Sequence, residues 1–372
     1  MRRGLWIQVA ATKPLDALNL LDEMRDDRPG VVMAPEHKPD TLKSLYQRAR
    51  EVTAVLIDPS GFLYDRNPRQ RARRHYPWLA VGTPDATDLK ERGWPRPQTS
   101  REWADWMRIG VEHQMSFDSP EVPSAHVIPT PQLEAAGGRD MFGQIADALD
   151  EVRGEYPDAW LGINIDRDYL REEQHLTRLA NYLVSAHGTG ILLRCFQSEM
   201  PPISDRRLLQ GLSDVVAATA AEGTLVILPR SGWLGWLAMT WGAYGFSGGL
   251  GNGTWYDRMP TPMTNVPRRE KIFERQLLRD VPWPVHVQLR EQAGYSPCAC
   301  SACDEMGGSY DIDLVRRHRI LAAYEISDVG TADPAQVVTA AINQAIDFRN
   351  SLPPVLRDRV DAKFLDAWQA LL

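Results

Sequence analysis

The 372-residue sequence has no excess of basic residues: 42 lysines and arginines stand against 49 aspartates and glutamates, so the net charge is −7 at pH 7. This balance excludes nucleic-acid binding driven by a net positive charge of the whole protein. Any such binding would have to use local basic patches. The sequence also contains no run of about eighteen apolar residues, so we expect no membrane span and no membrane partner.

Two further absences bear on the compartment. Met1–Gly4 leads directly into a short apolar run and lacks the long apolar core of a secretory signal. Cysteine is rare, with four residues in the chain. We expect a cytoplasmic protein, because a reducing compartment keeps thiolates available for a metal.

Three of the cysteines nevertheless stand together in Cys298-Ala299-Cys300-Ser301-Ala302-Cys303. A disulfide within this spacing would leave one thiol over, whereas three thiolates can converge on one tetrahedral ion with a fourth ligand from elsewhere. We therefore predict bound zinc; the alternative is a redox pair with a bystander. Three thiolates and no open coordination position are typical of a structural zinc.

The fourth zinc ligand is predicted to be His318, which lies downstream of Cys303 within the ordinary reach of such a site. The alternative is that His318 is one more solvated residue in a basic helix turn. His286, between Val285 and Val287, is expected in a strand, and Asp328 is the remaining candidate.

Eight short apolar runs, rich in β-branched residues, alternate with longer amphipathic stretches. Near-continuous apolar strands separated by helices favour parallel pairing with both faces of the sheet buried. Eight such units predict an α/β protein with a (β/α)8 TIM barrel; the alternative is an open doubly wound sheet. The predicted strands are 5–10, 31–34, 53–58, 125–129, 160–166, 190–196, 224–229 and 244–248. The predicted helices are 15–24, 41–50, 100–113, 141–155, 169–186, 205–221 and 233–242, followed by 311–326, 334–349 and 357–371.

The barrel is predicted to occupy residues 1–290, with a long insertion at 59–123. Residues 291–372 are expected to form a zinc-binding segment after the last strand and C-terminal helices packed on the barrel. A loop as long as the insertion is usually functional, and this one carries a basic run at 67–75. The alternative is a solvated loop. The residues predicted to contact the phosphate backbone of nucleic acid are Arg69, Arg71, Arg73 and Arg74.

Active sites of such barrels lie at the C-terminal ends of the strands. Asp58 ends the third predicted strand and Asp166 the fifth, and both are candidate catalytic carboxylates. The alternative roles are a turn cap for Asp58 and an N-cap of the following helix for Asp166. For a site role, Asp58→Asn is expected to abolish activity with little change in melting temperature. Further candidates at strand ends are Glu36, His37, Asn164, Arg194, Gln197, Arg230 and Ser247, the last two beside glycine-containing loops of a kind that hold phosphate.

The spacing Cys298-x-Cys300-x-x-Cys303, after the strands of a barrel, resembles the tRNA-guanine transglycosylase (queuine tRNA-ribosyltransferase) superfamily. Asp58-Pro59-Ser60-Gly61-Phe62 is similar to the Asp-Ser-Gly-Gly-Phe turn of that family, and Ser116-Phe117-Asp118 to its Phe-Asp segment. Leu161-Gly162-Ile163-Asn164 is similar to the start of its Phe-Gly-Ile-Val-Gln-Gly-Gly segment. The resemblance implies a structural zinc and the exchange of guanine for a 7-deazaguanine base in nucleic acid. The base site that we expect contains Asp118, Gly162, Asn164, Arg194, Gln197, Arg230 and Ser247 beside the catalytic Asp58 and Asp166.

The chain departs from the family at three points. Ile165, Asp166 and Arg167 replace the glutamine and two glycines of the base-binding segment. Residues 245–249 hold no carboxylate where the family has its nucleophilic aspartate, and the zinc histidine of the family lies further downstream than His318.

We therefore expect a diverged enzyme that acts on the N-glycosidic bond of a guanine or 7-deazaguanine base in tRNA or DNA. Zinc is its expected cofactor, nucleic acid and a purine or 7-deazapurine base are its expected partners, and a homo- or heterodimer is compatible with the sequence. One alternative is a non-catalytic, zinc-containing barrel that serves as a nucleic-acid-binding or accessory subunit. The other is an unrelated barrel enzyme for a small molecule.

Overall fold

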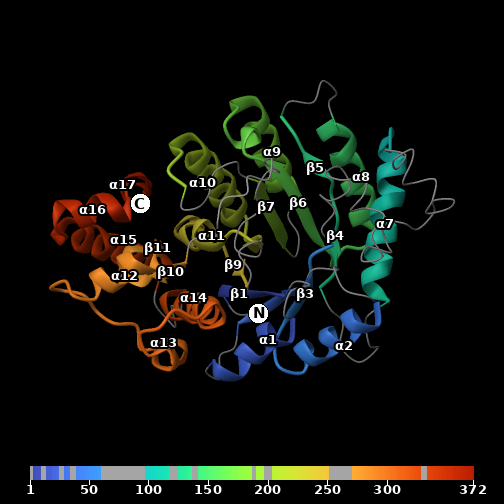
Figure 1. Ribbon diagram of the computed structural model, residues 1–372. Helices are drawn as coiled ribbons and strands as arrows, with labels where there is room; N and C mark the ends of the chain where they lie inside the picture. The colour runs from blue at the N-terminus through green and yellow to red at the C-terminus, as the bar shows by residue number, and fades with distance from the viewer. Residues whose placement is uncertain are drawn as a thin grey trace, which may run out of the picture.

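A curled parallel sheet forms the centre of the computed structural model, and helices cover its outer face (Figure 1). The structure describes residues 3–9, 14–24, 29–33, 39–59, 97–116, 125–135, 141–186, 190–196, 203–250, 270–327 and 333–372. In sheet order, the strands are β3 (Val55–Ile57), β2 (Gly30–Met33), β1 (Gly4–Val9), β9 (Gly245–Gly248), β8 (Val226–Leu228), β7 (Ile191–Phe196), β6 (Trp160–Asp166) and β4 (Val127–Ile128). A short strand, β5 (Gln132–Leu133), also pairs with β6.

The strand order follows the chain around a ring, because the first strand, β1, pairs with the last, β9. The two edge strands of this path also meet, through one isolated parallel bridge between Leu56 and Ala125. An open doubly wound sheet keeps its edges apart and reverses its order in the middle. The sheet is therefore a curled, partial (β/α) barrel, and the eight predicted strands are all present.

Alternate residues of the strands face the inside of the curl, as the two-residue period of a strand requires. Seven of them form one apolar cluster, separate from the cluster that packs under the helices: Trp6, Val32, Leu56, Val127, Trp160, Leu192 and Ile227. Glycines make room for its two tryptophans, since a Cβ at Gly30 would lie 2.4 Å from the Trp6 ring and one at Gly190 would lie 2.5 Å from the Trp160 ring. This close-packed cluster closes the lower part of the concave face.

Seven helical segments alternate with the strands on the outer face, each burying an apolar stripe against the sheet. Local capping sets where some of them begin: Thr99 and Glu102 form a capping box, and Asp205 accepts hydrogen bonds from two backbone N–H groups. The segments are α1 (Pro14–Asn19) with η1 (Leu20–Glu23), α2 (Pro39–Arg50), α7 (Ser100–Met115), α8 (Met141–Glu155), η2 (Asp168–Leu170) with α9 (Glu173–Ser185), α10 (Arg206–Ala221), and α11 (Gly232–Ala238) with η3 (Met239–Trp241).

The chain beyond β9 forms a hairpin and then helices. Strands β10 (Lys271–Glu274) and β11 (Arg279–Pro282) pair antiparallel around η5 (Arg275–Leu277). The helices are α12 (Trp283–Leu289), α13 (Ser301–Met306), α14 (Ile312–Ser327), α15 (Pro334–Ser351), α16 (Pro354–Val360) and α17 (Phe364–Gln369). The strand predicted around His286 is wrong, because this residue lies in α12, where Pro284 occupies the first turn.

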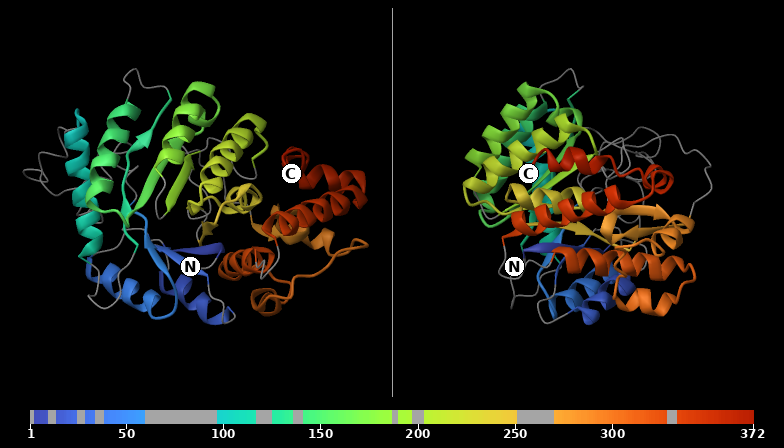
Figure 2. Two further views of the ribbon diagram at one scale, coloured as in Figure 1. Left: turned by 180° about the vertical axis from the view of Figure 1, so that it is seen from behind. Right: turned by 90° about the vertical axis from the view of Figure 1, so that its left-hand side faces the viewer.

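Helix α14 packs where the eighth helix of a (β/α)8 barrel would lie. Trp236 of α11 donates its indole N–H to the carbonyl of Ile326 at 3.3 Å, and Arg317 pairs with Glu23 of η1 at 2.7 Å. The hairpin, α12 and α13 are therefore inserted between the last strand of the sheet and the helix that follows it. Figure 2 shows α15–α17 on the side of the molecule opposite α7 and α8. None of the described helices is long and apolar enough to cross a lipid bilayer.

Candidate functional site

The three clustered cysteines and His318 converge, as the sequence predicts. The ligand atoms of Cys298, Cys300, Cys303 and His318 all lie within 4.8 Å of one another. His318 Nδ1 is 3.3 Å from Cys300 Sγ and 3.2 Å from Cys303 Sγ. All four cysteines of the chain are free thiols, so the arrangement is not that of a disulfide pair. Three sulfurs and one imidazole nitrogen suit a tetrahedral zinc ion.

Two helices hold the ligands in place. Cys300 is the N-cap of α13, and the backbone N–H of Cys303 donates to the carbonyl of Cys300 at 2.9 Å, so the first turn of this helix sets the Cys-x-x-Cys half of the motif. His318 comes from α14, and its Nε2 lies 2.8 Å from the carbonyl oxygen of Phe273 in β10. Because a carbonyl can only accept, Nε2 carries the proton and Nδ1 presents its lone pair to the cysteines.

The electrostatics of the cluster favour a cation. Hydrogen bonds with Cys298 and Cys303 lower the pKa of Cys300 to about 3. Hydrogen bonds with Cys298 and Cys300, together with burial, raise the pKa of Cys303, because they oppose a second negative charge. One thiolate therefore forms easily, and Cys303 would ionise only with a positive ion beside it. Zinc bound here would leave no open position and would cross-link the segment before α13, α13 itself and α14.

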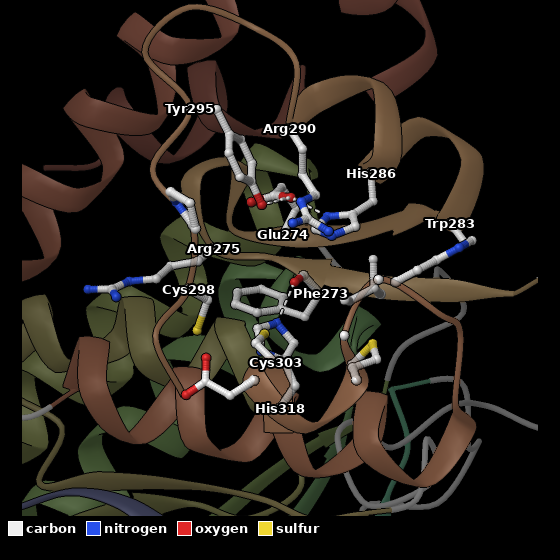
Figure 3. A pocket seen from close by; sticks show the side chains of 16 residues that line it. Phe273, Glu274, Arg275, Trp283, His286, Arg290, Tyr295, Cys298, Cys303 and His318 are labelled. Atoms are coloured by element: carbon white, nitrogen blue, oxygen red, sulfur yellow. Dashed lines mark hydrogen bonds and ion pairs between the residues drawn. The ribbon is translucent and has the colours of Figure 1, made fainter. Parts of the chain in front are cut away.

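A cavity of about 180 Å³ adjoins the metal centre, and Figure 3 shows Glu274, His286 and Tyr295 on its far side from His318. His286 Nδ1 lies 2.8 Å from Glu274 Oε2, and the hydroxyl of Tyr295 donates to the same oxygen at 3.4 Å. Burial and the charge of Glu274 raise the pKa of Tyr295, so this hydroxyl keeps its proton. His286 thus belongs to a polar network behind the centre and is not one of its ligands.

The concave face holds a second group of predicted residues. Asp58, at the end of β3, and Arg194, in β7, form an ion pair across the inside of the curl. Their side chains are 7% and 1% exposed, so the pair is almost fully removed from solvent. A buried charge of this kind persists in proteins only when it is paired. The structure therefore joins two strand-end residues that the sequence predicted separately.

Asn164 and Gly162 of β6 fix the loop that follows β4. The Asn164 side chain donates to the carbonyl of Thr130 at 2.8 Å, and the Thr130 hydroxyl donates to the carbonyl of Gly162 at 2.6 Å. A Cβ at Gly162 would lie 2.9 Å from the carbonyl oxygen of Ile128, which explains the glycine. Within the described residues, these two positions have structural roles.

Asp166 caps the chain after β6. Its carboxylate accepts from the backbone N–H of Tyr169 at 2.9 Å and from that of Ala135 at 3.3 Å. Burial raises the pKa of Asp166, although both hydrogen bonds act to lower it. The N-cap residue of the following η2 is Arg167, so Asp166 is not itself the predicted N-cap, but its two backbone contacts give it a structural role of the same kind.

Arg230 and Ser247 form a third contact on this face. Arg230 has a left-handed backbone, with φ of 48°, which is uncommon for a residue with a side chain and often marks a functional turn. Its backbone N–H donates to Ser247 Oγ at 2.8 Å, and Ser247 Oγ donates to Gln8 Oε1 at 2.7 Å. Gln8 was not predicted; the signal in the sequence is a single polar side chain inside the buried run Leu5–Val9.

Several predicted residues lie outside the part of the chain that the structure describes. The basic run and the predicted guanine reader are among them, so these predictions stay predictions. They are Glu36, His37, Arg69, Arg71, Arg73, Arg74, Asp118, Gln197 and Asp328. No protein-family model matches the chain, and no curated protein matches it significantly.

Proposed function

We propose that this protein is a zinc-containing (β/α)8 barrel that exchanges a guanine or 7-deazaguanine base at the N-glycosidic bond of tRNA or DNA. One observation carries the proposal. The three cysteines of the Cys3His cluster lie in an insertion between β9 and α14, and the histidine lies in α14, which is where the family resemblance implies a zinc site. Asp58 meanwhile directly follows β3 on the concave face, where barrel chemistry takes place, because Leu56, two positions earlier, belongs to the inner cluster.

The strand register supports a closed barrel. Starting at Gln8 and following the paired residues through all eight strands leads back to β1 at Gly4. To reach the next paired residue, the path has to move forward along the strands by four residues in total. It also returns to β1 four residues before its starting point, at Gly4 instead of Gln8. The register therefore slips by eight residues in one circuit. A slip of eight over eight strands is the shear of a (β/α)8 barrel.

The proposed chemistry rests on Asp58 among the described carboxylates, since Asp166 is engaged as a cap. Base exchange requires a carboxylate that stabilises the cation-like sugar carbon or accepts hydrogen bonds from the base. Arg194 would hold Asp58 in one orientation while the base enters. The metal would fasten the insertion to the barrel and take no part in the reaction, because its four ligand positions are filled by protein.

The second candidate is a non-catalytic, zinc-containing barrel that binds nucleic acid or serves as an accessory subunit. Two observations favour it. Residues 245–248 of β9 contain no carboxylate at the position of the family nucleophile, and Asp58 is neutralised by Arg194.

A base-exchange assay tests the proposal. Metal-loaded protein is incubated with radiolabelled guanine and either tRNA or duplex DNA, below the melting temperature of every variant. We expect label to enter one of the two nucleic acids, and Asp58→Asn to abolish this. Asp214→Asn, at an exposed position of α10, is the matched control and should keep full activity. If the wild-type protein binds either nucleic acid without incorporating label, the accessory role replaces the enzymatic one.

A further inference from the structure

We infer that Gln8 recognises the base, by donating a hydrogen bond to the acceptor of a lactam ring such as guanine. This inference rests on the proposed function, and it adds a base-reading residue that the resemblance does not supply. Gln8 lies in β1 and is 1% exposed. It faces the concave side, because Trp6, two positions earlier, belongs to the inner apolar cluster.

The amide of Gln8 is oriented by its neighbours. The backbone N–H of Arg230 can only donate, so Ser247 accepts from it and uses its own hydroxyl proton to donate to Gln8 Oε1. The nitrogen of the amide is thereby turned away from Ser247. This Nε2 is buried and has no hydrogen-bond partner among the residues that the structure describes.

A second buried glutamine differs from Gln8 in this respect. Gln114, in α7, donates from Nε2 to the carbonyls of Gly110 and Val127 and accepts from the backbone N–H of Val127. All of its polar atoms serve the fold. Burying an amide N–H without an acceptor is unfavourable, so the unpaired donor of Gln8 is stabilised when a ligand supplies the acceptor.

Gln8 and Asp58 lie at one level of the concave face. Gln8 pairs in register with Val32, and Val32 with Leu56. In such a barrel the register slips by about one residue per strand. In β3, two strands away from β1, the residue at the height of Gln8 is therefore two positions after Leu56 in the sequence, and this residue is Asp58. An amide donor and a carboxylate acceptor therefore stand on the same layer, just above the apolar cluster.

This pair matches one edge of a purine and mismatches another. Guanine and 7-deazaguanine present adjacent N–H donors and a carbonyl acceptor, which fit the Asp58 carboxylate and the Gln8 amide nitrogen. Adenine presents an amino donor where guanine has that acceptor, so the amide of Gln8 would meet another donor. The geometry therefore favours a lactam base, and the discrimination comes from leaving polar groups unpaired with the wrong base.

Binding of free guanine and adenine to the metal-loaded, full-length protein tests this inference by calorimetry. We expect the wild type to bind guanine, and Gln8→Met to weaken this by tenfold or more. The melting temperature of Gln8→Met should stay equal or rise, since an unpaired buried group is removed. The control, Gln114→Met, should melt lower and bind guanine as the wild type does. Gln8→Glu replaces the amide donor by an acceptor and should bind guanine no better than Gln8→Met. This variant provides the same test if Gln8→Met does not fold.

The outcomes separate the two proposals. Unchanged guanine affinity in the Gln8 variants, with binding lost in Asp58→Asn, overturns the role of Gln8 and leaves the proposed function standing. A lower melting temperature with unchanged affinity makes Gln8 a structural residue like Gln114. A wild-type protein that binds neither guanine nor 7-deazaguanine overturns both proposals.

Discussion

The metal centre and the concave face are built in opposite ways. All four candidate metal ligands come from one short stretch, 298–318, and three of them lie just before or in the first turn of a single helix, α13. The concave-face side chains come from strands spread over the chain, and Asp58 and Arg194 are 136 positions apart. A local cluster depends on spacing and one helical turn, whereas the distant pair exists only when the sheet curls. The two sites should therefore respond differently to mutation.

The largest effect is expected at the metal centre. Cys300→Ser removes a ligand and should reduce bound zinc from one per chain to almost none. Binding of a structural zinc contributes on the order of 10 kcal/mol to the folding of small domains, so the insertion should lose its cooperative melting transition. Elemental analysis and calorimetry measure both effects.

Cys195→Ser is the control for the metal centre. Cys195 lies in β7 and packs in the cluster under the helices, so this variant should keep its metal. A Cys300→Ser protein that retains one tightly bound zinc would show that the centre is not built from these ligands.

The next largest effect is expected from the buried ion pair. Arg194→Met leaves Asp58 without this cation and should lower the free energy of unfolding by about 3–5 kcal/mol, and Asp58→Asn should cost a similar amount. The structure thus replaces the expectation of a nearly unchanged melting temperature for Asp58→Asn. In the double variant much of the loss should return, because neither charge is left alone. Urea denaturation of all four proteins measures the coupling, and strictly additive losses would rule it out.

A smaller effect is expected in the apolar layer beneath this pair. In Gly190→Ala the new Cβ would lie 2.5 Å from the buried Trp160 ring, which should cost about 1–3 kcal/mol. Gly154→Ala, in α8 with no atom within 4 Å of the new Cβ, should instead stabilise by about 0.5–1 kcal/mol. Thermal denaturation compares the two. Equal effects would mean that Trp160 is not held tightly on the concave face.

The smallest effect concerns Asp166 and pH. Burial raises the pKa of this carboxyl in the folded protein above its ordinary 3.8, so stability falls as the pH rises from below that value through the raised pKa. Asp166→Asn keeps a capping oxygen and should lack this slope. Denaturation at a series of acidic pH values measures the difference between the two proteins. Parallel profiles would contradict the raised pKa, and loss of base exchange at unchanged stability would give Asp166 a chemical role.

Much of the fold was readable from the sequence, and its failures have local causes. The eight strands were predicted because buried parallel strands are nearly continuous apolar runs between helices. The hairpin β10–β11 was missed. Helix α12 was missed because Val285-His286-Val287 alternates like a strand, while Pro284 lies in the first turn of a helix. The sequence offered two roles for Asp166, a catalytic carboxylate and a cap. Only the contacts with the backbone of Tyr169 and Ala135 show that it has a structural one.

The cluster of candidate metal ligands and the alternation of strands and helices could be predicted from the sequence, because spacing along a helix turn and hydrophobic period act over a few residues. Tertiary structure alone decided the pairing of Asp58 with Arg194 and the contact of Gln8 with Ser247, which join residues 136 and 239 positions apart. The register of the curled sheet sets which inward side chains share a level. No local pattern carries that information, because register is fixed by the packing of all the strands together.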